Sequence, residues 1–173
     1  MKIAYIKSET RGEMDNVLYD VAQKLRADGH RLAGVVQINT ERPNGGRCDM
    51  DIKVLPDGAT LRISQDLGKG ACGCRLDPSA LETAVSQTEA ALAHGADCVI
   101  INKFGKQEAE GRGFRSVIAE ALARDIPVVV GVNALNFQAF VAFTEGLAEP
   151  VNDTPQAIER WFHKETVACS VEV

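Results

Sequence analysis

The sequence lacks several features that mark common functional classes. No apolar stretch approaches the roughly 20 residues that a membrane-spanning helix needs, so we expect no membrane partner. The formal net charge is −5, which argues against a nucleic-acid-binding surface because such surfaces are basic. The amino-terminal apolar stretch is too short and too charged to be a secretory signal, so we expect a cytoplasmic protein.

The number and spacing of the cysteines do not suggest a disulfide framework. The chain has five cysteines, an odd number at irregular spacing: Cys48, Cys72, Cys74, Cys98 and Cys169. Cys72 and Cys74 are weak metal candidates, because two thiolates fall short of the four ligands of a structural zinc site. We expect these two thiols to pack in a tight turn, with redox pairing as a weaker alternative, and we assign no metal site.

A phosphate-binding loop is also missing. The stretch 2–7 is a predicted strand and 15–28 a predicted helix, but the turn between them contains only Gly12 of the pattern Gly-x-x-x-x-Gly-Lys-Ser/Thr. The acidic residues Glu9, Glu13 and Asp15 would repel a triphosphate. An ordinary turn is the favoured interpretation, although amides at a helix start attract anions. Four residues of the turn therefore remain ligand candidates: Ser8, Thr10, Arg11 and Gly12.

The apolar pattern predicts an α/β fold. Buried strands are expected at 31–38, 98–101 and 127–132, and helices at 78–94, 112–124, 136–146 and from 155 onward. Two further strands at 49–55 and 59–64, joined by Pro56-Asp57-Gly58, predict an antiparallel hairpin insertion. We expect a single α/β domain over 1–165 and a carboxyl-terminal tail over 166–173.

Residues 98–115 carry the strongest functional signal. The predicted strand 98–101 runs into four cations within thirteen positions: Lys103, Lys106, Arg112 and Arg115. Ligands of open α/β sheets bind at the carboxyl ends of strands, so an anion site is expected there. Its candidate residues are Asn102, Lys103, Gly105, Lys106 and Arg112. The alternative is that Lys106–Glu110 and Glu108–Arg112, each spaced four apart, form surface ion pairs on a helix.

The segment 65–77 is rich in glycine and follows the hairpin, so it could act as a lid. Lys69 and Arg75 would then close on the anion.

Two phrases of the sequence resemble a bacterial family of small α/β proteins. They are ISQDLG at 63–68 with GCRLDP at 73–78, and NKFGKQEAEGRG at 102–113. Members of that family are encoded beside molybdate-uptake and molybdenum-enzyme genes, which implies a molybdenum or tungsten role. The chain is also similar to small phosphate-loop nucleoside triphosphatases, which implies a three-layer α/β fold with a mostly parallel sheet. The motifs depart from theirs, since Asn102 and Lys103 replace the acidic pair that follows the strand.

The leading hypothesis is a non-hydrolysing protein that binds a small oxyanion, molybdate or tungstate ahead of phosphate. The second is a divergent nucleotide-binding triphosphatase or phosphotransferase that uses ATP or GTP with magnesium. The third is an interaction protein or chaperone that contacts a molybdenum enzyme, a transporter or a second copy of this chain.

Overall fold

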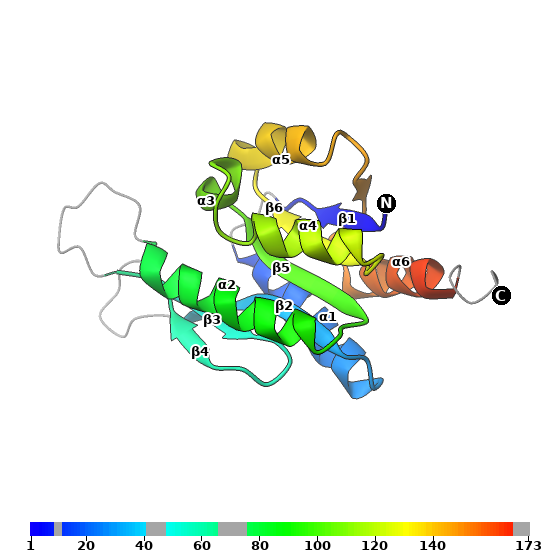
Figure 1. Cartoon of the computed structure of the whole chain (residues 1–173), viewed down its shortest axis with the longest axis horizontal. Coiled ribbons are helices and arrows are strands. Elements are labelled where there is room, and N and C mark those ends of the chain that lie inside the picture. The colour runs from blue at the N-terminus through cyan, green and yellow to red at the C-terminus, as the bar shows by residue number, and fades with distance from the viewer. Residues whose placement is uncertain (9–11, 41–47, 66–75, 168–173) are drawn as a thin grey trace.

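The computed structural model describes residues 1–8, 12–40, 48–65 and 76–167, and centres on a seven-stranded sheet (Figure 1). In chain order the strands are β1 (Ile3–Ile6), β2 (Leu32–Thr40), β3 (Asp49–Val54), β4 (Thr60–Arg62), β5 (Cys98–Phe104), β6 (Val128–Val132) and β7 (Glu149–Pro150). The helices are α1 (Glu13–Ala27), α2 (Pro78–Ala93), α3 (Lys106–Ala109), α4 (Arg115–Ala123), the 3-10 turn η1 (Ala134–Asn136), α5 (Phe137–Phe143) and α6 (Pro155–Val167).

The sheet order is β4-β3-β2-β5-β6-β1-β7. The neighbours β2/β5, β5/β6, β6/β1 and β1/β7 are parallel, and β2/β3 and β3/β4 are antiparallel. The predicted α/β class, with a mostly parallel sheet and a hairpin at one edge, is confirmed. The sequence did not predict that β5 and β6 would lie between β1 and β2.

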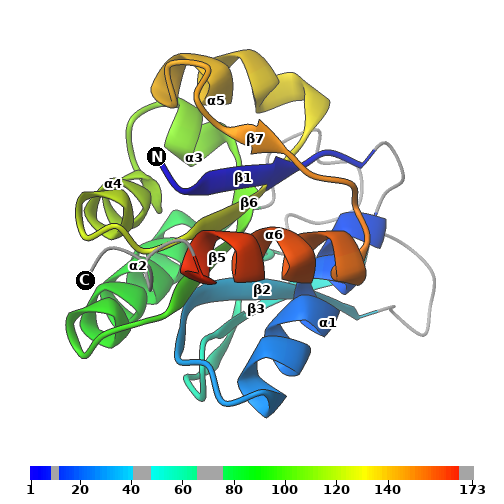
Figure 2. The ribbon, with the colours of Figure 1, turned by 90° about the vertical axis from the view of Figure 1, so that its right-hand side faces the viewer.

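Helices cover both faces of the sheet, which gives three layers and two apolar cores. One core packs α2, α4 and α5 against one face, and the other packs α1 and α6 against the opposite face. Figure 2 shows α6 lying beside α1 on its face of the sheet. Both faces of the central strands are therefore buried, which explains their nearly continuous apolar sequences.

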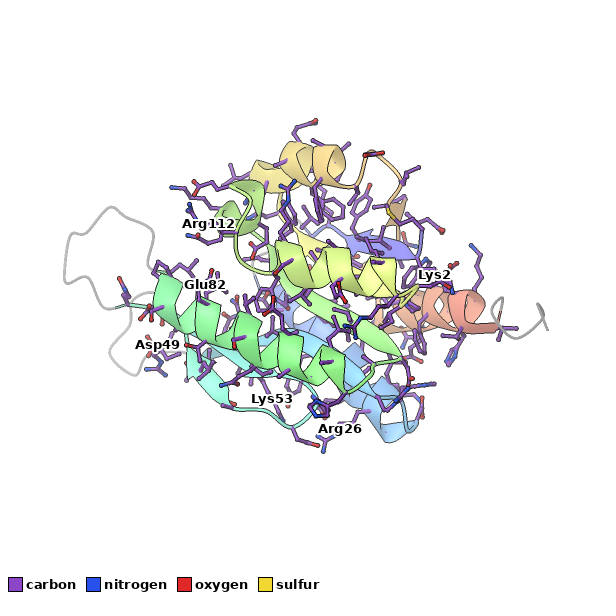
Figure 3. All side chains as sticks on the ribbon, viewed as in Figure 1. Lys2, Arg26, Asp49, Lys53, Glu82 and Arg112 are labelled. Carbon is purple, nitrogen blue, oxygen red and sulfur yellow. The ribbon has the colours of Figure 1, made fainter. Side chains whose placement is uncertain are left out.

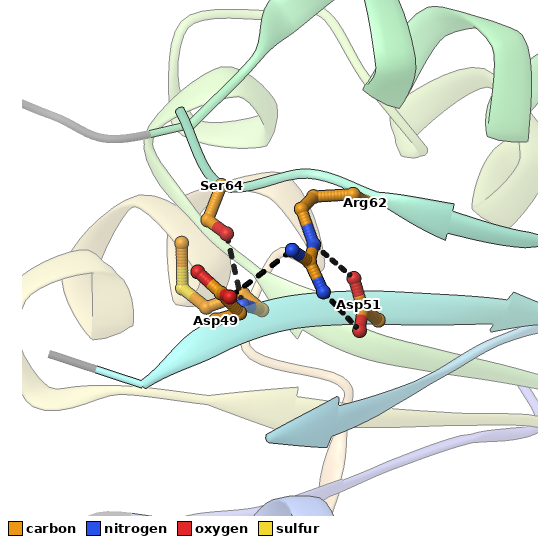
Figure 4. Close-up of polar contacts among 5 residues, drawn as sticks. Asp49, Asp51, Arg62 and Ser64 are labelled. Carbon is orange, nitrogen blue, oxygen red and sulfur yellow. Dashed lines mark hydrogen bonds and ion pairs between the residues drawn. The ribbon is translucent and has the colours of Figure 1, made fainter. Parts of the chain in front are cut away.

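The hairpin and the start of α2 form as the sequence predicts. Asp51 pairs with Arg62 across the hairpin, and the Arg62 guanidinium contacts both Asp49 and Asp51 at 2.9–3.0 Å (Figure 4). The Asp77 carboxylate caps α2 by accepting hydrogen bonds from the backbone N–H groups of Ser79 and Ala80. Both features are local, which is why short stretches of sequence predict them.

Several boundaries differ from the prediction. Strand β5 continues to Phe104 instead of ending at Ile101, so Asn102 and Lys103 lie inside the strand. The short helix α3 and the edge strand β7 were not predicted, and α4 starts at Arg115 instead of Arg112. Asn133, and not Asn136, supplies the side-chain cap at the start of η1. Among the described residues, no helix is both long and apolar enough to cross a bilayer.

Candidate functional site

A cavity of about 420 Å³ lies at the carboxyl edge of the sheet, and we call it the strand-end cavity. It is lined by Ser8, Gly12, Met14, Asp15, Gln37, Asn39, Cys48, Met50, Lys103 and Asn133.

Topology brings these distant residues together. The parallel strands β1, β2, β5 and β6 all end at the same edge, and each contributes residues at or just after its end. Strand β3 runs antiparallel to β2, so its start, near Cys48 and Met50, reaches the same edge. This is where open α/β sheets bind ligands.

A buried carboxylate dominates one wall of the cavity. Asp15, in the first turn of α1, is only 5% exposed. Its Oδ2 accepts hydrogen bonds from Gln37 Nε2 at 3.1 Å and Asn39 Nδ2 at 2.6 Å, while its Oδ1 accepts one from Asn102 Nδ2 at 2.8 Å. Three amide donors therefore hold the charge, as buried charges require. We call these four residues the Asp15 cage.

Asn102 belongs to this cage and does not line the strand-end cavity. It is 3% exposed, and its Oδ1 has no hydrogen-bond partner within the described part of the chain. The pairing of β5 with β6 is irregular between Ile101 and Phe104, and the peptide bond from Asn102 to Lys103 is cis. We expected Asn102 just beyond the strand as a ligand contact; the structure places it inside the strand, where it binds Asp15.

Lys103 is the cation that faces the strand-end cavity. It also lines a smaller cavity of about 80 Å³, whose walls include Ile52, Leu81 and Phe114 of one apolar core. Its side chain forms no ion pair with any described residue. A half-buried ammonium without a counter-ion is a suitable contact for a small anion.

The backbone amide of Gly105 was expected to face the anion, but it is already engaged. It donates to Glu108 Oε2 at 2.8 Å, while the Phe114 amide donates to Glu108 Oε1 at 3.0 Å. Glu108 is 3% exposed, and this burial raises the pKa of its carboxyl group despite those two hydrogen bonds. Glu108 thus binds the loop that follows β5 instead of pairing with Arg112.

The four cations of 98–115 do not converge, which corrects the expectation from sequence. Lys106 is exposed and lies 3.7 Å from Glu110, as its spacing predicts. Arg112 pairs with Glu110 and donates to Gln107, and Arg115 lies over the ring of Phe143. Only Lys103 reaches the strand-end cavity.

Arg112 lines a separate open groove of about 500 Å³ between α2 and the α3–α4 turn. Figure 3 shows Arg112 near α3 and Glu82 on α2, and both residues line this groove. The carboxylates of Glu82 and Glu89 line the same groove and would repel an anion there.

Ser8 and Gly12 do line the strand-end cavity, and the Ser8 hydroxyl donates to Glu13 Oε2 at 3.2 Å. Gly12 adopts a φ of 83° at the start of α1, a conformation that glycine adopts without strain. Six candidate residues lie outside the described residues: Thr10, Arg11, Lys69, Cys72, Cys74 and Arg75. Within the described ranges, no group of three His, Cys, Asp or Glu side chains could hold a metal ion.

Sequence reasoning missed most of the cavity wall. Gln37 and Asn39 could have been found as polar residues at alternate positions near the end of an apolar strand. Asp15 was noted only as a source of repulsion. For Met14 and Met50 there was no signal, because apolar side chains of this kind are usually core.

Two solved structures share the fold over nearly the whole chain. A human cancer-related nucleoside triphosphatase matches with 14% identity and a TM-score of 0.61, covering 99% of this chain and 98% of that chain. THEP1 from the hyperthermophile Aquifex aeolicus matches with 16% identity and a TM-score of 0.62, covering 100% of both chains. These similarities establish a P-loop-NTPase-like fold and do not establish an activity.

The sequence is also similar to a curated protein, the molybdenum import ATP-binding protein ModC 2 of Bradyrhizobium diazoefficiens. The identity is 37% over 161 residues, which is 93% of this chain but 18% of that protein. The chain thus spans less than a fifth of the relative's length. Residues 3–161 match the family described as "Protein of unknown function (DUF2478)", and the chain therefore belongs to the DUF2478 family.

Proposed function

We propose that this protein binds a small tetrahedral oxyanion in the strand-end cavity and serves molybdenum uptake without hydrolysing a nucleotide. Molybdate or tungstate is the favoured ligand, ahead of phosphate. The observation that carries the proposal is Lys103, an ammonium group at the carboxyl edge of the sheet with no counter-ion among the described residues. Ser8 and Asn133 supply nearby polar groups for the anion's oxygens.

The charges of the cavity favour a small anion over a nucleoside triphosphate. Glu13 follows Gly12 where a phosphate loop has its lysine, and Met14 stands where such a loop has a serine or threonine. Asp15 adds a buried negative charge, and its three amide partners reduce its field without removing it. One ammonium can hold a compact dianion but cannot offset this carboxylate and four triphosphate charges together.

Non-hydrolysis is favoured by the end of β5. Metal-dependent triphosphatases hold magnesium there with an acidic side chain, and Asn102 is an amide that faces Asp15. Lys103 follows it in place of a second acid. The molybdenum role is favoured by the relative, whose name describes an ATP-binding protein of molybdenum import.

Nucleotide binding is the second candidate, and the fold similarity to nucleoside triphosphatases favours it. In this case the phosphates would contact Lys103 from the cavity side, with Glu108, which lines the smaller cavity beside Lys103, as a candidate for placing water. Burial raises the pKa of Glu108, but its oxygens already accept two backbone hydrogen bonds. It is therefore poorly placed to position water.

Titration calorimetry tests the proposal directly. Molybdate, tungstate, sulfate and phosphate are titrated singly, followed by ATP and GTP with and without magnesium. Lys103→Ala should abolish or weaken oxyanion binding at least about tenfold. Lys106→Ala is the matched control, because it removes an exposed lysine three residues away that pairs with Glu110 and should change little.

Oxyanion binding of equal strength in wild type and Lys103→Ala would reject the site. Tight binding of magnesium nucleotides with no oxyanion binding would favour the enzyme hypothesis. No binding by any of these ligands would direct the search to protein partners.

A further inference from the structure

We propose that the smaller cavity beside Lys103 binds a small α-amino acid of the size of alanine. The inference goes beyond the proposed function, because it assigns a second ligand to a second cavity. The two cavities share Gln37 and Lys103 as wall residues, so the two sites are neighbours. Three features of the smaller cavity carry the inference: an unsatisfied buried acceptor, a buried carboxyl group, and an apolar wall that encloses a limited volume.

The unsatisfied acceptor is Asn102 Oδ1. Asn102 lines the smaller cavity and is 3% exposed, and its Oδ1 accepts no hydrogen bond from any residue that the structure describes. A buried carbonyl oxygen is unfavourable without a donor, so a donor from outside the chain fits there. Gln37, on the same wall, already donates both N–H groups of its amide, to Asp15 and Asn39, and can only accept further bonds. The cavity therefore suits a ligand that donates hydrogen bonds.

The buried carboxyl group belongs to Glu108, which lines the same cavity. Each of its oxygens accepts one backbone hydrogen bond, from Gly105 or Phe114, and a carboxylate oxygen can accept a second. Burial raises the pKa of this group, and no described side chain forms an ion pair with it. An ammonium group would supply the missing positive charge, and its three N–H donors could serve Glu108 and Asn102 together.

The wall and the volume limit the rest of the ligand. Apolar side chains form much of the wall: Val35, Ile52, Ile63, Leu76, Leu81 and Phe114. An engineered apolar cavity of roughly 150 Å³ holds benzene, with six carbons, so a cavity of about 80 Å³ has room for roughly three non-hydrogen atoms. The ammonium nitrogen, the α carbon and the methyl group of alanine match this number. Water alone suits the cavity less well, because a buried water needs two to four polar partners.

Lys103 is the contact for the carboxylate of the amino acid. It is half-buried, and it lines both cavities. The carboxyl group of Glu108 would repel an anion inside the smaller cavity, so the ligand's carboxylate fits on the Lys103 side and its ammonium fits beside Glu108 and Asn102. Lys106 also lines the smaller cavity, but its ammonium is exposed and lies 3.7 Å from Glu110.

Titration calorimetry of the full chain with three ligands tests this assignment. L-Alanine, L-lactate and propionate carry an ammonium, a hydroxyl or a hydrogen on the same carbon. Alanine should bind at least about tenfold more tightly than lactate, and propionate should bind most weakly, because each change leaves more of the buried acceptors unpaired. L-Leucine should not bind, because its larger side chain exceeds the volume of the cavity.

Methyl NMR locates the ligand in the same protein. L-Alanine should shift the methyl signals of Ile52 and Leu81, which line the smaller cavity, and leave those of Leu25 in the opposite core unchanged.

Two variants test the named contacts. Glu108→Gln removes the buried charge, so alanine affinity should fall at least about tenfold while lactate affinity stays unchanged. Leu81→Phe fills the smaller cavity and should abolish alanine binding without changing molybdate affinity. Leu61→Phe is the matched control, because Leu61 packs against the same core but lines neither cavity. If Leu81→Phe does not fold, the ligand series on the wild type still decides the question.

Equal affinities for alanine and propionate, or no binding of either, would overturn the inference. Lactate that binds as tightly as alanine would overturn the amino-acid assignment, since the ammonium would then contribute nothing. Alanine binding that leaves Ile52 and Leu81 unshifted would place the ligand elsewhere and overturn the site. None of these outcomes affects the oxyanion proposal, because molybdate is titrated separately and binds in the other cavity.

Discussion

Asn102 Nδ2 donates a hydrogen bond to Asp15 Oδ1 at 2.8 Å, which joins the end of β5 to the first turn of α1 across 87 residues. Both side chains are buried, so the contact fixes the α1 side of the strand-end cavity. The position where metal-dependent triphosphatases hold magnesium with an acid is therefore occupied by an amide that holds the protein's own carboxylate.

Asp15→Asn should strengthen oxyanion binding and weaken the fold. The variant removes a negative charge from the cavity wall, so molybdate affinity should rise a few-fold to about tenfold. The NH₂ group of asparagine at position 15 would point at one or more of the amide NH₂ groups that now donate to Asp15, so at least one hydrogen bond would be lost. This loss should lower the free energy of unfolding by about 1–3 kcal/mol. Calorimetric titration and urea unfolding measure the two effects separately.

Asp20→Asn is the control, because Asp20 is an exposed residue of the same helix that does not line the cavity. A gain in affinity as large in Asp20→Asn as in Asp15→Asn would mean that net charge and not the cavity wall is responsible.

Asn102→Asp should place two carboxyl groups within hydrogen-bonding distance in a buried setting. Repulsion would raise the pKa of the pair above its value in the unfolded chain. The sign follows from linkage: the folded state of the variant gains stability as pH falls and loses it as pH rises through the raised pKa. Urea unfolding of variant and wild type at about pH 5 and about pH 8 should show a larger stability deficit at the higher pH. A stability deficit of Asn102→Asp that is the same at both pH values would contradict direct contact between the side chains at positions 15 and 102.

Glu108 should give the wild type a measurable pH dependence. Burial raises the pKa of its carboxyl group above the ordinary value, so its contribution to stability is present below that ordinary value and is lost as pH rises through the raised one. The free energy of unfolding of wild type relative to Glu108→Gln should therefore fall from about pH 4 to about pH 7. A relative stability that rises over that range would show that the two backbone hydrogen bonds outweigh desolvation.

Gly113→Ala should destabilise the protein more than Gly111→Ala. Both glycines have positive φ, 60° and 86°, so alanine costs about 1–2 kcal/mol at either position. At 113 a Cβ would also collide with Glu108 Oε1, whereas at 111 no atom lies within 4 Å. The additional loss at 113 should be about 1–3 kcal/mol, since the buried carboxylate must leave its two amide donors. Equal losses in urea unfolding of the two variants would mean that the Glu108 contacts contribute little.

The fold was accessible from sequence where the signals are local. Alternating and continuous apolar runs predicted the central strands, Pro56-Asp57-Gly58 predicted the hairpin, and Asp77 with Pro78 predicted the start of α2. The end of β5 was misjudged because polar residues normally end a buried strand. Asn102 continues the strand since its side chain is satisfied by Asp15, a partner that no local pattern reveals.

The site was accessible only in part. Lys103 was found because a cation at the carboxyl end of a parallel strand is a local signal. Arg112 was wrongly placed with Lys103, because the turn between α3 and α4 directs it to another groove, where it pairs with Glu110. Spacing four apart suggested an ion pair between Glu108 and Arg112, but α3 ends at Ala109 and the Glu108 side chain turns inward to backbone amides.

The sequence by itself determined the α/β class, the hairpin insertion and the edge of the sheet at which the strand-end cavity lies, because each depends on periodicity, turn chemistry or strand direction. Tertiary structure alone decided which side chains meet at that edge. The order β2-β5-β6-β1 brings Asp15, Gln37 and Lys103 to the wall of one cavity, although these residues lie far apart in the chain. Which side chains meet depends on which strands become neighbours. The strand order in turn depends on all the helices packing together so that both faces of the sheet are buried.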